Sequence, residues 1–370
     1  MHEQHYRVGS KIFINAYAGL YESAKTNIFC EFIIPQYHLD SFTKVDVQSL
    51  SQYTSQDLIE EKIRRLRDTY PRIRFHYTGG RDSHTMMLAA QKLGIKFEQL
   101  FTHTNTIWED PKDEYEFVSG IEYAKTTGMH HIVHRATMND VEEVWCNPDC
   151  FNSYDDFYHG FNPIYTDLFL RNYNKDYLEL LGLEKPRYFI KGNNYYWLLH
   201  DAGDYCTPQP HEDFFIGSFF PELAIKQVMQ GLAYIKKFHP TKQGFVDHKD
   251  LDVQKFCRYL GLDDGIDTKI NKTNEDYWKY GYFNEKHRRC LYQVFNQGKH
   301  FIVNEWVKRG WEIADKLRHA PHGLHEFKFI EPKIKQEVCM TTPVVRIGAI
   351  FKLNQDSIEL LPHKDISLLT

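Results

Sequence analysis

Apolar residues fall at helical spacing in one stretch of the chain and alternate with polar residues in the next. Residues 55–67 place their apolar side chains on one face of a capped helix. The predicted buried stripe of this helix is Leu58, Ile59, Ile63 and Leu66. Residues 73–77 alternate as in a β-strand, but Arg74 and His76 interrupt a segment that would be apolar on both faces at the centre of a parallel sheet.

A glycine turn follows this strand and leads into a second helix. Residues 78–80 break the strand, and we expect Gly80 to have backbone angles that are costly for a residue with a Cβ atom. Asp82 and Ser83 are suited to cap the helix that the apolar residues of 86–94 predict. A glycine loop before a helix exposes backbone N–H groups and the positive end of the helix dipole. The pattern therefore predicts an anion site, most naturally for phosphate.

Strands and helices continue to alternate after this helix. The predicted strands are Lys96–His103, His130–Ala136 and Arg187–Lys191, and the predicted helices are Asp113–Thr127 and Ile164–Leu181. This alternation is typical of an α/β fold with a parallel sheet. Ligands bind such sheets outside the carboxyl ends of the strands. We therefore expect residues 78–83, 103–109 and 192–194 to lie together.

The pattern divides the chain into four segments. Residues 1–54 are a mixed segment expected to pack on the nucleotide-binding domain of residues 55–218. Residues 219–339 form a mainly helical C-terminal substrate or lid region, and residues 340–370 form a hairpin-like tail. Helices are predicted at Pro221–Lys237, Leu251–Leu260 and, with interruptions, Glu285–Arg318.

Composition narrows the class of protein. The 370 residues carry a net charge of −5, which gives no overall attraction to nucleic acid or to an anionic membrane. No apolar run has the length of a membrane span, and the N-terminal residues do not begin a signal peptide. Seven scattered cysteines favour a reducing compartment over a disulfide framework. We therefore predict a cytoplasmic protein.

The glycine turn resembles a known phosphate-binding motif. Thr78-Gly79-Gly80-Arg81-Asp82-Ser83 is similar to the PP-loop of the ATP pyrophosphatases, usually written S-G-G-x-D-S, with threonine in the first position. The later segment 100–114, with Thr104, Asn105 and a Trp108-Glu109-Asp110-Pro111 run, is similar to the phosphoadenosine-phosphosulfate-reductase-like branch of that superfamily. The resemblance implies a PP-loop (HUP-like, Rossmann-like) nucleotide domain.

The resemblance also implies an activity and the residues that carry it. Such enzymes cleave ATP between its α- and β-phosphates, adenylylate an acceptor and release pyrophosphate. The implied catalytic residues are Arg81, Asp82 and Ser83, and Asp82 is the implied Mg²⁺ ligand. The implied ATP-binding residues are Thr78, Gly79, Gly80, Asp82, Ser83, Thr104, Asn105 and Gly192.

The acceptor is left open by the sequence. It is a small molecule or a nucleic acid, and an ammonia- or sulfur-donating partner protein is compatible with the chemistry. Sulfonucleotide reduction is disfavoured because Cys339 lacks the adjacent glycine of the reductases' Cys segment. The alternatives are a nucleic-acid-modification subunit, which would bind RNA or DNA in a salt-dependent way, and a nucleotide-binding protein without turnover.

Cysteine and histidine patterns elsewhere give weaker signals. Cys146 and Cys150 have a metal-like spacing, but a fourth ligand for a structural site is not evident. His322 and His325 lack the internal glutamate of zinc proteases and are interpreted as ordinary loop residues. The basic run 286–289 is either a solvated helix face or a cationic lid over pyrophosphate.

Overall fold

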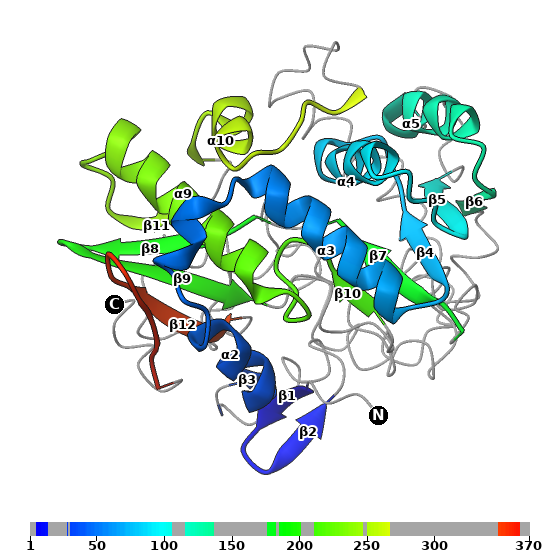
Figure 1. The fold of residues 1–370 in the computed structure, drawn as a ribbon. Helices are drawn as coiled ribbons and strands as arrows, with labels where there is room; N and C mark the ends of the chain where they lie inside the picture. Colours follow the sequence, from blue (N-terminus) through cyan, green and yellow to red (C-terminus); the bar gives the residue numbers. More distant parts are fainter. Residues whose placement is uncertain are drawn as a thin grey trace.

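The chain folds around three β-sheets in a computed structural model (Figure 1). The structure describes residues 5–13, 28, 30–105, 115–136, 176–182, 185–200, 211–246, 250–266 and 347–362. The sheet orders are β2-β1-β3, β10-β7-β4-β5-β6 and β11-β8-β9-β12-β13. The second of these sheets is parallel throughout, and the other two are antiparallel. The fold is therefore α/β, with antiparallel sheets added to a five-stranded parallel one.

The parallel sheet contains the strand predicted before the glycine turn as its middle strand. Its members are β4 (Ile73–His76), β5 (Gln99–Asn105), β6 (His131–Ala136), β7 (Leu178–Leu181) and β10 (His211–Asp213). The strands predicted over 96–103 and 130–136 are confirmed. The helix predicted over 164–181 is wrong at its end, because Leu178–Leu181 is strand β7. A short apolar run has no periodicity that separates strand from helix.

Three helices follow the predicted pattern closely. They are α3 (Ser55–Thr69), α4 (Arg81–Lys92) and α5 (Tyr115–Thr126). Helix α3 begins with a capping box, in which Thr54 and Asp57 satisfy each other's backbone N–H groups. The predicted apolar stripe of α3 is buried. Figure 1 shows α3 between α4 and α9.

The polar residues of β4 are explained by a buried network on one face of the sheet. Arg74 Nη1 lies 3.1 Å from Glu179 Oε1 on β7, and His76 Nε2 lies 2.9 Å from Glu179 Oε2. Gln99 on β5 accepts a further hydrogen bond from the Arg74 Nε atom. The strand is thus apolar only on the face of Ile73 and Phe75, and on the other face a carboxylate from the neighbouring strand pairs with Arg74 and His76.

The five-stranded antiparallel sheet is built from distant parts of the sequence. Its strands are β8 (Arg187–Lys191), β9 (Asn194–His200), β11 (Gly244–Val246), β12 (Ile347–Leu353) and β13 (Ile358–Leu360). The predicted strand 187–191 exists, but it pairs antiparallel with β9 and β11 and is not a member of the parallel sheet. The tail contains a hairpin of β12 and β13, and its first strand extends this sheet by pairing with β9.

The helices predicted at the start of the second half are confirmed. They are α9 (Pro221–Phe238), with proline in its first turn, and α10 (Val253–Tyr259), capped by Asp252. The Tyr188 hydroxyl of β8 donates a 2.9 Å hydrogen bond to the Val228 carbonyl, which fixes α9 on the antiparallel sheet. Helix α10 then carries the chain towards the N-terminus of α4.

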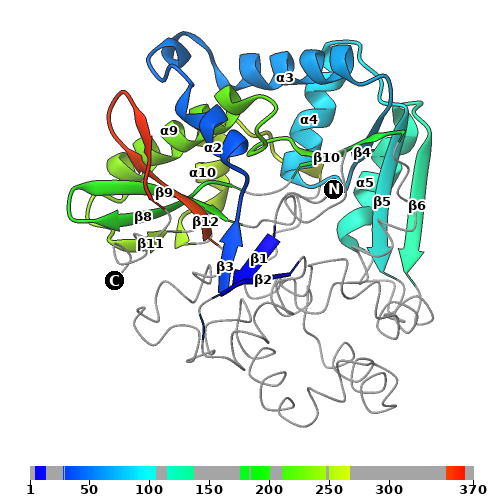
Figure 2. The same cartoon turned by 90° about the horizontal axis from the view of Figure 1, so that it is seen from below.

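The N-terminal segment packs mainly on the antiparallel sheet. It contains β1 (His5–Val8), β2 (Lys11–Phe13), β3 (Cys30–Ile33), α2 (Gln36–Thr43) and the 3-10 turn Ser49–Gln52. Phe42 contacts Trp197 and Phe351, with ring centroids 5.2 and 5.9 Å away. Figure 2 shows β3 and α2 beside the strands of that sheet.

Several predictions lie outside the described residues. They are the helix over 285–318 with its basic run, the pair Cys146 and Cys150, His322 and His325, Cys339, and the 108–111 run. Within the described ranges, no helix combines the length and apolarity that crossing a bilayer requires.

Candidate functional site

The glycine loop, Thr78–Ser83, connects the middle strand of the parallel sheet to helix α4. Gly79 has a φ of +80°, in the left-handed region that favours glycine. A Cβ atom at Gly79 would lie 2.6 Å from the Gly120 Cα atom of α5. Gly80 instead has φ −65° and ψ 162°, which any residue adopts. The expectation for Gly80 is therefore wrong, and Gly79 is the position that needs glycine.

Helix α4 begins two or three residues earlier than Asp82 or Ser83 as its N-cap would predict. Its N-cap is Gly80, and Asp82 and Ser83 lie in the first turn. The Ser83 hydroxyl accepts from the Thr78 N–H at 3.3 Å and donates to the Gly80 carbonyl at 3.2 Å. Thr78 Oγ1 in turn accepts from the Gly80 N–H at 3.2 Å. Both hydroxyls thus hold the loop in shape around the first N–H groups of the helix.

Asp82 is the acidic group of the loop, and it has one free oxygen. Its Oδ2 atom forms an ion pair with Lys185 Nζ, and both side chains are largely buried. Its Oδ1 atom is buried and has no hydrogen-bond partner among the described residues. A buried carboxylate oxygen without a partner is costly, and a ligand donor or a magnesium ion would satisfy it. The arrangement therefore fits the metal role predicted for Asp82.

A magnesium ion at Asp82 would need further ligands from outside the protein. No group of three or more His, Cys, Asp or Glu side chains suited to a metal is found within the described part of the chain. Mg²⁺ is commonly held by one or two carboxylates together with phosphate oxygens and water. A single protein carboxylate is therefore sufficient for this kind of binding where phosphate oxygens and water supply the other ligands.

Lys185 is a site residue that the sequence did not reveal. It follows β7 (Leu178–Leu181), a segment that the sequence pattern predicts as the end of the helix over 164–181. In the structure Gly182 lies against the first turn of α4, where an added Cβ would come within 3.4 Å of the Ser83 N atom. The strand pairing of β7 with β4 therefore brings Lys185 to the glycine loop.

The site lies where the strand order of the parallel sheet reverses. From β4 the chain adds β5 and β6 on one side, and then β7 and β10 on the other. Ligands of open α/β sheets bind at this topological switch point, outside the carboxyl ends of the strands. The glycine loop follows β4 and Lys185 follows β7, so the two segments at the switch point contribute the charged groups.

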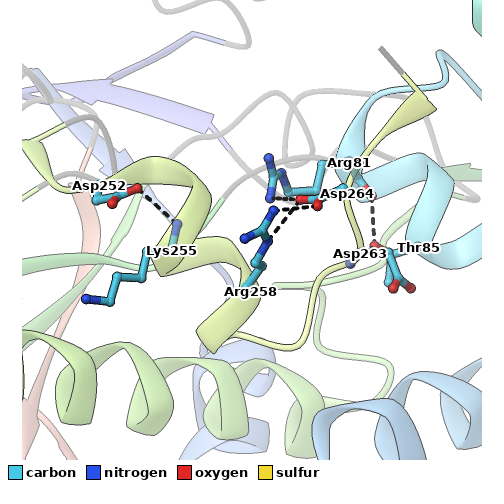
Figure 3. Close-up of polar contacts among 7 residues, drawn as sticks. All are labelled: Arg81, Thr85, Asp252, Lys255, Arg258, Asp263 and Asp264. Carbon is cyan, nitrogen blue, oxygen red and sulfur yellow. Dashed lines mark hydrogen bonds and ion pairs between the residues drawn. The ribbon is translucent and has the colours of Figure 1, made fainter. Parts of the chain in front are cut away.

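Arg81 is engaged by an acidic residue from a remote segment (Figure 3). Its Nη1 atom lies 3.0 Å from Asp264 Oδ1, and Arg258 Nη2 of α10 lies 2.7 Å from Asp264 Oδ2. The hydrogen bond from Arg258, and then the charges of Arg258 and Arg81, hold the pKa of the Asp264 carboxyl below its usual value. The predicted catalytic arginine therefore already holds an anion.

Two other predicted binding segments have different positions. Thr104 and Asn105 are the last residues of β5, at the carboxyl edge of the parallel sheet. Their side chains are not among those that the structure describes. Gly192 lies in the turn between β8 and β9, with its N–H bonded to Gln243 Oε1 at 2.8 Å. Its predicted position beside the loop is wrong, because strand 187–191 belongs to the antiparallel sheet.

The groups behind the loop are apolar or neutral. His84 is buried and its ring lies 4.9 Å from that of Tyr123, and desolvation lowers the pKa of its imidazole. Cys257 of α10 is buried, and its burial raises the pKa of the thiol. A buried thiol with a raised pKa is a poor nucleophile. The chemistry of the site therefore depends on Asp82, Lys185, Arg81 and the backbone N–H groups.

Comparison with known proteins adds no relative: no family model matches the chain, and no curated protein matches it either.

Proposed function

We propose that this protein is an ATP pyrophosphatase of the PP-loop type. It binds ATP at the glycine loop, cleaves the bond between the α- and β-phosphates, and transfers the adenylyl group to an acceptor. The observation that carries the proposal is the loop Thr78–Ser83 at the switch point of the parallel sheet, with a free carboxylate oxygen of Asp82 and the ammonium of Lys185 beside it. Position, charge and loop sequence all favour phosphate binding.

The loop would hold the β- and γ-phosphates of ATP, which leave as pyrophosphate. The N–H groups of the first turn of α4 point out of the helix, and its dipole favours an anion there. Thr78 and Ser83 keep these donors in place through their hydrogen bonds within the loop. Lys185 is a cation within reach of the same anion, because it is already paired with Asp82 in the first turn. Once segment 263–266, which lies beside the Arg81 N–H group, moves away, the β- and γ-phosphates have donors and positive charge on one side.

Asp82 would hold the magnesium ion through its Oδ1 atom, which lacks a partner among the described residues. When bound, Mg²⁺ neutralises negative charge on the phosphates and on the departing pyrophosphate. Lys185 would keep the Asp82 carboxylate oriented in this role. Arg81 would contribute a second cation, once its guanidinium is released to the phosphates.

The reaction is a substitution at the α-phosphorus. A carboxylate or carbonyl oxygen of the acceptor forms a new bond to this phosphorus, and the bond to the bridging oxygen of the β-phosphate breaks. The electron pair leaves with pyrophosphate, and the adenylyl group stays on the acceptor. Preorganised donors at the leaving group are the main contribution that such a site makes to rate. The acceptor is a small molecule or a nucleic acid, and an ammonia or sulfur donor would consume the adenylylated product.

The test is product analysis with labelled ATP. The purified protein is incubated with ATP, Mg²⁺ and a metabolite or RNA extract, and pyrophosphate, AMP and adenylylated species are identified by mass spectrometry. We expect pyrophosphate from the parent and a loss of at least about 100-fold in Asp82→Asn, a scale typical of electrostatic groups in active sites. Release of phosphate and ADP in place of pyrophosphate would contradict the proposal.

A matched variant separates folding from chemistry. Asp82→Asn leaves Lys185 partly buried without its partner, so the protein could lose stability. The double variant Asp82→Asn with Lys185→Met removes both charges and should melt near the parent temperature while still releasing no pyrophosphate. Activity of this double variant at the parent rate would show that the loop is not the site.

A further inference from the structure

Two arginines from distant parts of the chain converge on one carboxylate at the edge of the glycine loop. Arg81 lies in the first turn of α4, and Arg258 lies in the last turn of α10. Asp264 Oδ1 lies 3.0 Å from Arg81 Nη1, and its two oxygens lie 3.3 and 2.7 Å from Arg258 Nε and Nη2. Figure 3 shows the carboxylate between the two guanidinium groups.

Backbone contacts hold the segment that carries this carboxylate against the loop. The Asp263 N–H donates to Thr85 Oγ1 at 2.8 Å, and the Ile266 N–H donates to the Gly79 carbonyl at 3.1 Å. Between them, Gly265 comes so close that a Cβ atom would lie 2.8 Å from the Arg81 N atom. The segment 263–266 therefore lies directly beside the first N–H group of α4.

Arginine pairs of this kind are suited to phosphate. A guanidinium presents a planar fork of N–H donors that matches the oxygens of a carboxylate or a phosphate. A phosphate group has more charge and one more acceptor oxygen than a carboxylate, so it satisfies two forks better. The Asp264 side chain is 40% exposed, and the Arg258 side chain is 61% exposed. The ion pair of Asp264 with Arg258 is therefore weak and exchanges readily. The Arg81 side chain is 13% exposed, so its pair with Asp264 is the better shielded of the two.

We propose that Arg81 and Arg258 form a two-arginine site for a phosphate group of the bound nucleotide, and that Asp264 is the resident anion which this phosphate displaces. This inference rests on the proposed function, which it extends by a binding residue from α10 and by a built-in competitor. The low pKa of Asp264 is consistent with it, because a carboxylate that stays ionised competes at neutral pH. Nucleotide binding would then release the 263–266 segment from Arg81.

The opposite role for Asp264 makes the opposite prediction. If its carboxylate positioned Arg81 for the ligand, its removal would weaken anion binding. If it competes, its removal strengthens binding. The sign of the change therefore decides between the two roles.

The experiment is calorimetric titration of the full chain with inorganic pyrophosphate and Mg²⁺. Asp264→Asn should bind pyrophosphate about three- to tenfold more tightly than the parent, the scale expected for release of an exposed ion pair on two arginines. Asp263→Asn is the matched control: it changes net charge equally in the same segment, and this residue makes its contact with Thr85 through the backbone. It should leave the affinity unchanged within about twofold.

Arg258→Gln, made in the Asp264→Asn background, should reverse the gain. Unchanged or weaker binding in Asp264→Asn would overturn the proposal, and so would an equal gain in Asp263→Asn. Absence of pyrophosphate binding in both the parent and Asp264→Asn would also overturn it. Failure of the proposed function is distinguished separately: the chain would bind pyrophosphate with these affinities and yet release none from ATP.

Discussion

The parallel sheet and the five-stranded antiparallel sheet are stabilised by different interactions. The parallel sheet and its surroundings contain buried charges, such as Lys62 with Glu212 at 2.6 Å and Arg74 with Glu179 at 3.1 Å. The antiparallel sheet is held by aromatic packing, in which the rings of Trp197 and Phe351 stack at 4.8 Å. Buried charges are costly unless they are paired, whereas aromatic packing is stabilising by itself. The parallel-sheet region therefore contains paired buried charges. The five-stranded antiparallel sheet forms an aromatic core, which is called the framework below.

The largest expected effect is in the framework. Trp197→Ala removes a side chain that is 1% exposed and contacts rings on β12 and α2. It should lower the free energy of unfolding by about 3–5 kcal/mol, because the cavity cannot be refilled. Urea unfolding followed by far-UV circular dichroism measures the change. A loss below about 1 kcal/mol would show that this core is not the framework.

A similar loss of stability is expected from one charge of the parallel sheet. Glu179→Ala leaves Arg74 and His76 buried beside each other without their carboxylate. Breaking a buried ion pair in this way costs about 3 kcal/mol or more. Glu179→Gln keeps the shape and the hydrogen-bond acceptor, so its cost should be clearly smaller in the same urea experiment. Equal losses in both variants would mean that shape, and not charge, matters at this position.

A smaller effect separates two glycines that share a backbone conformation. Gly79→Ala places a methyl group 2.6 Å from the Gly120 Cα atom at a φ of +80°. Gly94 has a φ of +68°, but a Cβ there has no atom within 4 Å. Gly94→Ala should therefore cost only about 1 kcal/mol for the backbone angle, and Gly79→Ala about 2–3 kcal/mol or more. An equal loss in the free energy of unfolding in both variants would show that Gly120 of α5 moves away from the added methyl group at little cost.

The smallest effect is a pH dependence at the start of α3. Hydrogen bonds from Thr54 lower the pKa of the Asp57 carboxyl in the folded protein. A lowered folded pKa stabilises the protein above the unfolded pKa of about 3.9, and this contribution is lost as the pH falls through the folded value. The melting temperature of the parent should therefore exceed that of Asp57→Asn at pH 6, and the gap should narrow towards pH 2.5. A constant gap would contradict the assignment.

Local patterns predicted the part of the site that is local in sequence. The strand, the glycine turn and helix α4 were predicted because capping, periodicity and glycine all act within a few residues. The predicted start of the helix was two or three residues late. The conformation predicted for Gly80 was wrong because the residue that needs glycine, Gly79, is set by its contact with Gly120 of α5. The polar residues of β4 looked inconsistent with a central strand because their partner, Glu179, is distant in sequence.

The remote half of the site could not be predicted in this way. Lys185 reaches Asp82 only because Leu178–Leu181 is a strand beside β4, and that apolar run has no distinguishing period. Asp264 and Arg258 reach Arg81 only through the packing of α10 and its following segment. Gly192 was placed wrongly for a related reason, because a strand sequence does not say which sheet it joins.

The most direct test of the central claim is calorimetric titration of the parent and Gly79→Ala with a non-hydrolysable ATP analogue and Mg²⁺. Gly94→Ala, which strains the backbone at the far end of the same helix, is the control. The account predicts that the parent and Gly94→Ala bind the analogue with the same affinity and that Gly79→Ala binds at least about tenfold more weakly, because a displaced loop misdirects its N–H donors. Equal affinity in all three proteins, or no binding by a folded parent, would contradict the claim that this loop holds the phosphates of ATP.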